Sequence, residues 1–114
     1  MKRIYAVDDA IEHINNLTEF ELKRPDHTPI YSVNGTKTYT VYSYGNHYPM
    51  YVYDKTVDRW YGNSDKFSRT TSRHMTKLCP DDGVHQYVDT YRLKAIAYHG
   101  IASTIANRME ESYA

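Results

Sequence analysis

IYSVNGTKTYTVYSYGNHYPMYVYDKTVDRWY, residues 30–61, is the stretch that decides the expected fold. β-Branched and aromatic residues recur in short runs separated by polar turn residues, a pattern typical of strands. Asn34-Gly35 between two such runs predicts a type I′ hairpin turn, because both central residues of that turn need positive φ. We therefore expect an antiparallel meander with strands at 30–33, 36–44, 49–53 and 59–61.

Helical patterns flank this meander. Apolar residues at helical spacing, with Asp9 and Glu12 as a capping box, predict a short helix from Asp9 to about residue 16 or 18. A short strand at 2–6 precedes it. A second short helix is expected over about 70–78, ended by Pro80. From residue 84 onwards helical spacing predicts the longest helix, bent near Gly100.

These elements predict a single α+β domain spanning residues 1–114. Its expected architecture is a small antiparallel meander of three to five strands packed against a long C-terminal helix, with short helices near the N-terminus and at 70–78. A chain of 114 residues is long enough for one modest core. The glycines, including Gly62, read as turn or bend residues.

Composition narrows the function classes. There are 14 basic and 14 acidic residues, so whole-chain charge marks neither a general DNA-coating protein nor an acidic DNA mimic. Cys79 is the single cysteine, which excludes an intramolecular disulfide and a cysteine zinc cluster. The first sixteen residues hold no long apolar run, so we expect a protein of the host-cell cytoplasm with no membrane contact.

One segment, residues 66–77, concentrates positive charge without any acid. A helix over 70–78 would place Arg69, Arg73 and Lys77 on one face, where they could line a phosphate backbone or an acidic protein surface. The alternative is a solvated helix face with hydroxyl capping. The binding residues expected in this segment are Lys66, Arg69, Thr70, Thr71, Ser72, Arg73, His74 and Lys77.

Tyrosine is the unusual residue of this chain, with 13 among 16 aromatics. Tyrosine suits both half-buried strands and contact surfaces, so most are expected in the sheet and a minority on its outward face. Tyr44, Trp60 and Tyr61 are the aromatic contact residues that we predict. An exposed tyrosine face beside a basic row would resemble a platform for single-stranded nucleic acid, or could pair with itself in a homodimer.

Catalytic motifs are weak. The order Tyr51, Tyr61-Gly62, Ser64, Arg69 or Arg73, and His74 loosely resembles the core of GIY-YIG nucleases. However, Pro49 replaces the first glycine, Thr70 stands at the usual arginine position, and Glu110 and Glu111 lie too near the C-terminus to supply the metal-binding carboxylate. The six histidines show no zinc-binding spacing, so we expect neither a metal nor another cofactor.

The segment YSYGNHYPMYVYD…WYGNSDKFSRTTSRH resembles a motif in small uncharacterised proteins of tailed phages and related mobile elements. The matching positions are Tyr42, Ser43, Tyr44, Asp54, Trp60, Tyr61, Asn63, Lys66, Phe67, Ser68, Thr70, Thr71, Ser72, Arg73 and His74. They span about a third of the chain. The resemblance implies a phage-like origin and a shared domain, without a mechanism.

Together these features predict a small non-enzymatic phage or mobile-element protein. We expect it to bind a host or phage protein complex, as an inhibitor or adaptor of a host defence or nucleic-acid-handling complex. The first alternative is a nucleic-acid-binding accessory protein that uses residues 66–77. The second is a diverged GIY-YIG-like nuclease.

Overall fold

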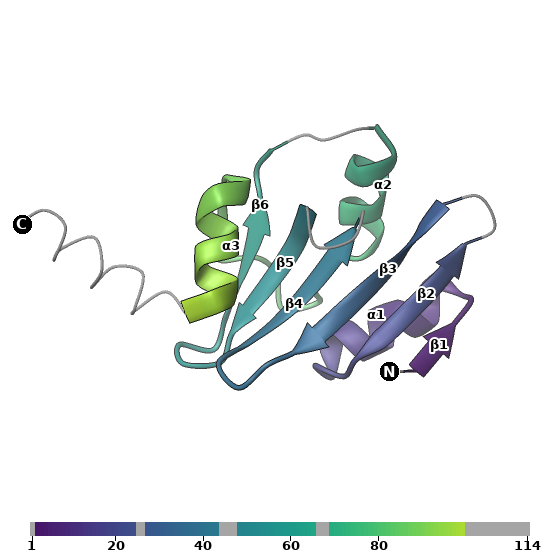
Figure 1. Ribbon diagram of the computed structural model, residues 1–114, viewed down its shortest axis with the longest axis horizontal. Coiled ribbons are helices and arrows are strands. Elements are labelled where there is room, and N and C mark those ends of the chain that lie inside the picture. Colours follow the sequence, from purple (N-terminus) through teal and green to yellow (C-terminus); the bar gives the residue numbers. More distant parts are fainter. Residues whose placement is uncertain (1, 25–26, 44–47, 66–68, 100–114) are drawn as a thin grey trace, which may run out of the picture.

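A computed structural model describes residues 2–24, 27–43, 48–65 and 69–99, which form one seven-stranded sheet and three short helices (Figure 1). The strands are β1 (Lys2–Ile4), β2 (Phe20–Arg24), β3 (His27–Asn34), β4 (Thr38–Ser43), β5 (Tyr48–Asp54), β6 (Arg59–Asn63) and β7 (Gln86–Val88). The helices are α1 (Val7–Asn15), α2 (Arg69–Lys77) and α3 (Thr90–His99).

The strands lie side by side in the order in which the chain makes them, from β1 to β7. Strands β2 to β6 form an antiparallel meander. The two outer pairs, β1 with β2 and β6 with β7, are parallel. A parallel pair needs a crossover connection, and here α1 and α2 supply the two crossovers.

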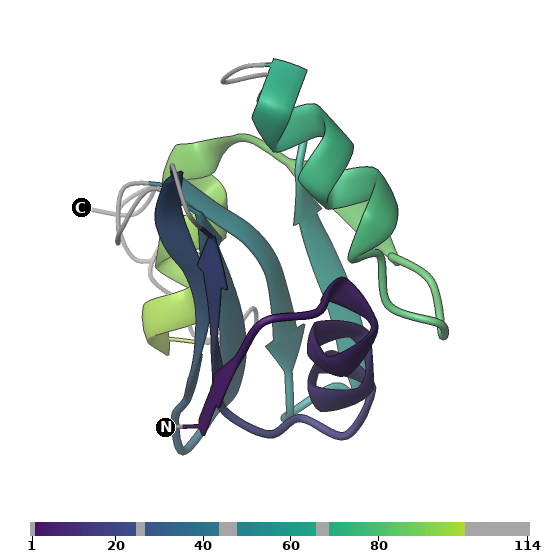
Figure 2. The ribbon, with the colours of Figure 1, turned by 90° about the vertical axis from the view of Figure 1, so that its right-hand side faces the viewer.

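Both crossovers proceed in the same direction along the sheet, from strands that run the same way. Because such connections share a right-handed sense, α1 and α2 are expected on the same face of the sheet. Figure 2 shows both helices on one side and α3 on the other. The sheet is therefore covered on one face by α1 and α2 and on the other by α3.

Each face has its own core. The larger core fills the space between the sheet and the two crossover helices, with Ile14 and Phe20 near α1 and Leu78 just after α2. The smaller core lies beneath α3, where Leu93 and Ile96 are buried. Successive side chains along a strand point to opposite faces of the sheet. Tyr51 and Trp60 therefore lie in the larger core, whereas their neighbours Val52 and Tyr61 lie in the smaller one.

Trp60 is the aromatic centre of the larger core. Its ring meets those of Tyr39, Tyr51 and Tyr53 edge to face, with ring centroids 6.1, 6.4 and 5.2 Å away. Edge-to-face contacts place the positive rim of one ring against the negative face of another. The tyrosine-rich strands are thus used largely as packing material, since Tyr39 and Tyr51 are fully buried.

The fold class predicted from the sequence is wrong. The antiparallel meander exists, but it is the middle of a seven-stranded mixed sheet, and the helices are all short. One parallel strand is added at each edge of the meander. Helix α1 connects β1 to β2, and α2 lies in the connection from β6 to β7, so that each pair of strands runs in the same direction. A short strand at 2–6 is predicted and β1 lies there, but β7 has only three residues, too few for an alternation pattern to be read.

The long C-terminal helix was also predicted wrongly. Residues 84–88 contain a loop and β7, and the described helix α3 begins only at Thr90. Val84 and Val88 have helical spacing, but Val84 packs on the larger core and Val88 lies in the smaller one. Two residues on opposite faces of a sheet cannot share a helical stripe. Residues 100–114 lie outside the described part of the chain.

The two short helices occur where they were expected, and their details differ. Helix α1 starts at Val7, two residues before the predicted Asp9 cap, and Ala6 provides no side-chain cap. The hairpin at Asn34-Gly35 is present, but neither residue has positive φ, so the turn is not type I′. A longer connection runs from Gly35 to Thr38, closed by the Gly35 N–H on the Thr38 carbonyl at 2.8 Å.

Candidate functional site

Helix α2 lies across one end of the larger core and is fixed there by its inner side. Met75 packs on that core, and the Tyr48 hydroxyl approaches its sulfur at 3.5 Å. The buried Tyr51 hydroxyl donates a hydrogen bond to the Met75 carbonyl. The helix is therefore held in a fixed position by two tyrosines of β5, which leaves its opposite side free to face solvent.

The outer side of α2 carries positive charge. Arg73 and Lys77 are exposed, and the whole helix contains no acid. Within the described part of the chain, neither side chain has a hydrogen-bond or ion-pair partner. Successive cations four residues apart are separated by about 6 Å along a helix axis. This short cationic row is available to an anionic partner.

The remaining predicted residues of the basic segment fall into three groups. Ser72 is exposed beside the row, whereas His74 is half-buried and already interacts within the fold. The backbone places Arg69, Thr70 and Thr71 in the first turn of α2. Lys66 lies outside the described residues.

The predicted aromatic contact residues do not join this surface. Trp60 and Tyr61 are each 4% exposed, Trp60 in the larger core and Tyr61 beneath α3. Tyr44 lies outside the described residues. On the α3 side of the sheet, Tyr31 and Tyr42 stack with ring centroids 5.2 Å apart, and both are half-buried. Neither Trp60 nor Tyr61 can thus contribute to the tyrosine platform expected beside the basic row.

A hollow of about 510 Å³ opens between α2 and β7, beside the cationic row. One wall consists of Ser72, Met75 and Thr76 of α2 together with Cys79, which lies two residues beyond the end of the helix. The opposite wall includes Tyr87 of β7, and the end of β6 closes the floor. With 100° per residue, Thr76 and Arg73 lie about 60° apart around the helix, so the hollow and the row adjoin.

Gly62 shapes this hollow. It pairs with Tyr87 across the parallel strands β6 and β7, and the Tyr87 ring lies directly over it. A Cβ atom at Gly62 would stand only 2.6 and 2.8 Å from two carbons of that ring. The predicted turn at Gly62 is wrong, because Gly62 lies within β6. A glycine inside a strand pattern is the signal that could have revealed the close approach.

A hydrogen-bond network stabilises the floor. The Asn63 amide donates to the Pro49 carbonyl at 2.9 Å and to the Thr90 hydroxyl at 3.0 Å. Asp65 is the only acid among the residues that line the hollow, and its Oδ2 accepts the Thr90 N–H at 2.8 Å. Hydrogen bonds from Thr90 hold the pKa of Asp65 below its usual value of 3.8. Its carboxylate thus serves as a cap for α3.

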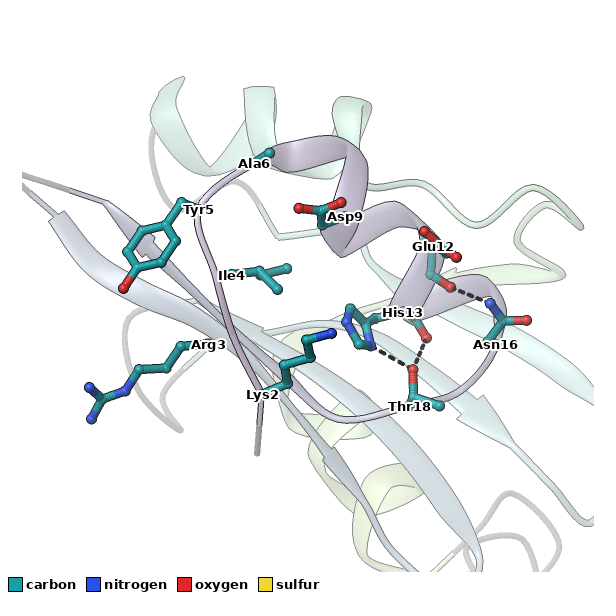
Figure 3. A pocket seen from close by; sticks show the side chains of 10 residues that line it. All are labelled: Lys2, Arg3, Ile4, Tyr5, Ala6, Asp9, Glu12, His13, Asn16 and Thr18. Carbon is teal, nitrogen blue, oxygen red and sulfur yellow. Dashed lines mark hydrogen bonds between the residues drawn. The ribbon is translucent and has the colours of Figure 1, made fainter.

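A second hollow, of about 620 Å³, lies between β1 and the outer side of α1 (Figure 3). Lys2 extends from β1 towards the His13 ring, whose Nδ1 is 2.7 Å from the Thr18 hydroxyl. Asp9 and Glu12 of α1 bring negative charge to the same hollow. Because charges of both signs line this hollow, it has no preference for anions. It therefore differs from the outer side of α2, which carries positive charge alone.

The structure separates the residues of the nuclease pattern. Tyr51 lies in the larger core and Tyr61 in the smaller one, on opposite faces of the sheet. The two hydroxyls therefore cannot act at one phosphodiester. In addition, no group of three or more metal-ligating side chains occurs within the described residues.

Comparisons with known proteins leave the chain without a family assignment. No protein-family model matches it, and no curated protein or solved structure matches it significantly. Among the helices described, none combines the length and the apolar character that crossing a membrane requires. The function must therefore be argued from the α2 surface itself.

Proposed function

We propose that this chain is a small non-enzymatic binding protein of a phage or mobile element, active in the host cytoplasm. It acts as an inhibitor or adaptor of a host defence or nucleic-acid-handling complex, and it binds that complex by placing α2 against an acidic protein surface. The observation that carries the proposal is the acid-free helix α2, which presents Arg73 and Lys77 without partners in the described structure. Opposite charge on a partner would steer and orient the encounter.

Two observations favour an acidic protein over nucleic acid as the partner. The chain has no excess of positive charge, and nucleic-acid binding draws most of its strength from cations. Trp60 and Tyr61, two of the aromatic contact residues expected beside the basic segment, are buried and offer no stacking surface. The two cations lie on a single helix, so they match a local acidic patch of a protein better than the long phosphate backbone of a nucleic acid.

The test compares two double variants of equal charge. Arg73→Glu with Lys77→Glu reverses the α2 row, and Lys37→Glu with Lys94→Glu reverses exposed lysines elsewhere. Each pair changes the chain from 14 basic and 14 acidic residues to 12 and 16. Tagged proteins are used to capture partners from host lysate, with and without nuclease treatment. Circular dichroism confirms that each variant is folded.

We expect a specific protein partner that survives nuclease treatment, is lost with the α2 variant and is retained with the control variant. Equal capture by both variants would refute α2 as the docking surface. Capture that depends on nucleic acid would instead support the accessory nucleic-acid-binding function. In that case binding should weaken with salt, with a slope that falls by about one for each phosphate contact removed.

A further inference from the structure

We infer that the hollow between α2 and β7 is an anchor pocket, and that the partner segment is an acidic peptide carrying one large apolar side chain. This inference rests on the proposed function, because the same α2 row supplies the charge. The anchor side chain would enter between Met75, Cys79 and Tyr87, and the flanking carboxylates would contact Arg73 and Lys77. Peptide interfaces commonly combine a buried anchor with a polar rim.

The walls of the hollow favour an apolar anchor. Met75 contributes a thioether, Cys79 a half-buried thiol and Tyr87 a ring that is 51% exposed. Methionine adapts its shape to the group that it contacts, and a cysteine behaves as a small apolar residue. The Tyr51 hydroxyl at the base is already bonded to the Met75 carbonyl. An apolar side chain can therefore be buried here without displacing that hydrogen bond.

Gly62 makes room for the pocket wall. Because it has no Cβ, the Tyr87 ring can lie against β6. A larger residue at position 62 would displace the ring from the sheet. The energy of this displacement is small for the fold, since the ring is half-exposed at the end of its side chain. The absence of a side chain at Gly62 therefore sets where the Tyr87 wall of the hollow lies in this structure.

The distribution of charge determines the kind of peptide. Arg73 and Lys77 directly follow the lining residues Ser72 and Thr76 along α2, and both are exposed. Asp65 is the one acid among the described lining residues, and its Oδ2 accepts the Thr90 N–H at the start of α3. Acidic residues of the peptide are thus attracted to α2, while a basic peptide would be repelled there. The volume of about 510 Å³ lies within the range of small binding sites.

The direct test uses three synthetic peptides and fluorescence anisotropy. Their sequences are Glu-Glu-Phe-Glu-Glu, the same peptide with Ala in place of Phe, and Lys-Lys-Phe-Lys-Lys, each with a flexible labelled tail. We expect the first to bind about tenfold or more tightly than the alanine peptide, from burial of the ring, and the lysine peptide not to bind. Equal affinity of the two acidic peptides, or no binding by either at low salt, would overturn the anchor pocket.

Two further measurements locate the site. Cys79 is the single thiol, so the phenylalanine peptide should slow its modification by a maleimide reagent, whereas the alanine peptide should not. Thr76→Trp fills the hollow without changing any charge and should abolish binding of the phenylalanine peptide. Exposed Thr36→Trp in the β3–β4 connection serves as the matched control. Unchanged binding by Thr76→Trp would refute the location.

The two proposals fail in different ways. If lysate capture is lost with the Arg73 and Lys77 variant but kept with Thr76→Trp, the charged surface stands and the anchor pocket is refuted. If capture is kept with both variants, the proposed function is refuted as well. Loss with both, together with selective binding of the phenylalanine peptide, supports both proposals.

Discussion

Asn63→Ala should destabilise the protein by about 2–4 kcal/mol, because this side chain joins three elements. Its amide donates to the Pro49 carbonyl at 2.9 Å and to the Thr90 hydroxyl at 3.0 Å. Its oxygen accepts the Asp65 N–H at 2.8 Å and the Thr90 hydroxyl at 3.3 Å. Four hydrogen bonds are lost at about 0.5–1 kcal/mol each, and the buried Pro49 carbonyl is left without this donor.

The assay is urea unfolding followed by circular dichroism. With a slope of about 2 kcal/mol per molar urea, the midpoint for Asn63→Ala should fall by about 1–2 M while the slope stays unchanged. Asn16→Ala is the matched control, because its exposed amide makes a single bond to the Glu12 carbonyl at 3.0 Å. That variant should change stability by less than about 0.5 kcal/mol. Equal midpoints for the two variants would refute the role assigned to the network.

Three further predictions concern the cores and α3. Burial raises the pKa of Tyr39 and Tyr51 well above 10.0, so the unfolded chain releases these protons first as pH rises. Stability should be fully retained below pH 10 and then fall by about 1.4 kcal/mol per pH unit for each tyrosine, measured by urea unfolding; a constant midpoint between pH 9 and 11 would contradict this. Trp60→Ala removes the centre of the aromatic cluster and should cost about 3–5 kcal/mol, read by circular dichroism because no tryptophan remains; a cost below 1 kcal/mol would be inconsistent with its burial. Thr38→Val removes the hydroxyl donated to the Ala97 carbonyl and should increase amide exchange in α3 about fivefold, whereas unchanged exchange would show that this bond does not hold the helix.

Local pattern was sufficient to predict the inner part of the fold. Strands β4, β5 and β6 and helices α1 and α2 occur close to their predicted places, because each carries enough residues to show a period. Strands β1 and β7 have three residues each, and although a strand is predicted at 2–6, the parallel pairing of both strands at the edges of the sheet is not. Their positions depend on crossovers that bring the chain back to the sheet, which no local window records.

The candidate site was only partly predictable. The charge row could be found from sequence, since Arg73 and Lys77 require only helical spacing to share a side. The burial of the tyrosines was not predictable, because tyrosine occurs both in cores and on surfaces. Tyr51 and Tyr61 are both buried because helices cover both faces of the sheet, which the sequence does not show. The hollow combines residues of β5, β6, α2 and β7, so its existence depends on tertiary structure.

The order of the strands has a consequence for how the protein is made. Every strand pairs with the one that precedes or follows it in the chain, so no pairing waits for a distant segment. Short sequence separations between contacts favour rapid folding. During synthesis each strand could join the growing sheet soon after it leaves the ribosome, with α3 closing the second face near the end. We therefore expect folding to keep pace with translation, without a long-lived intermediate that exposes an unpaired central strand.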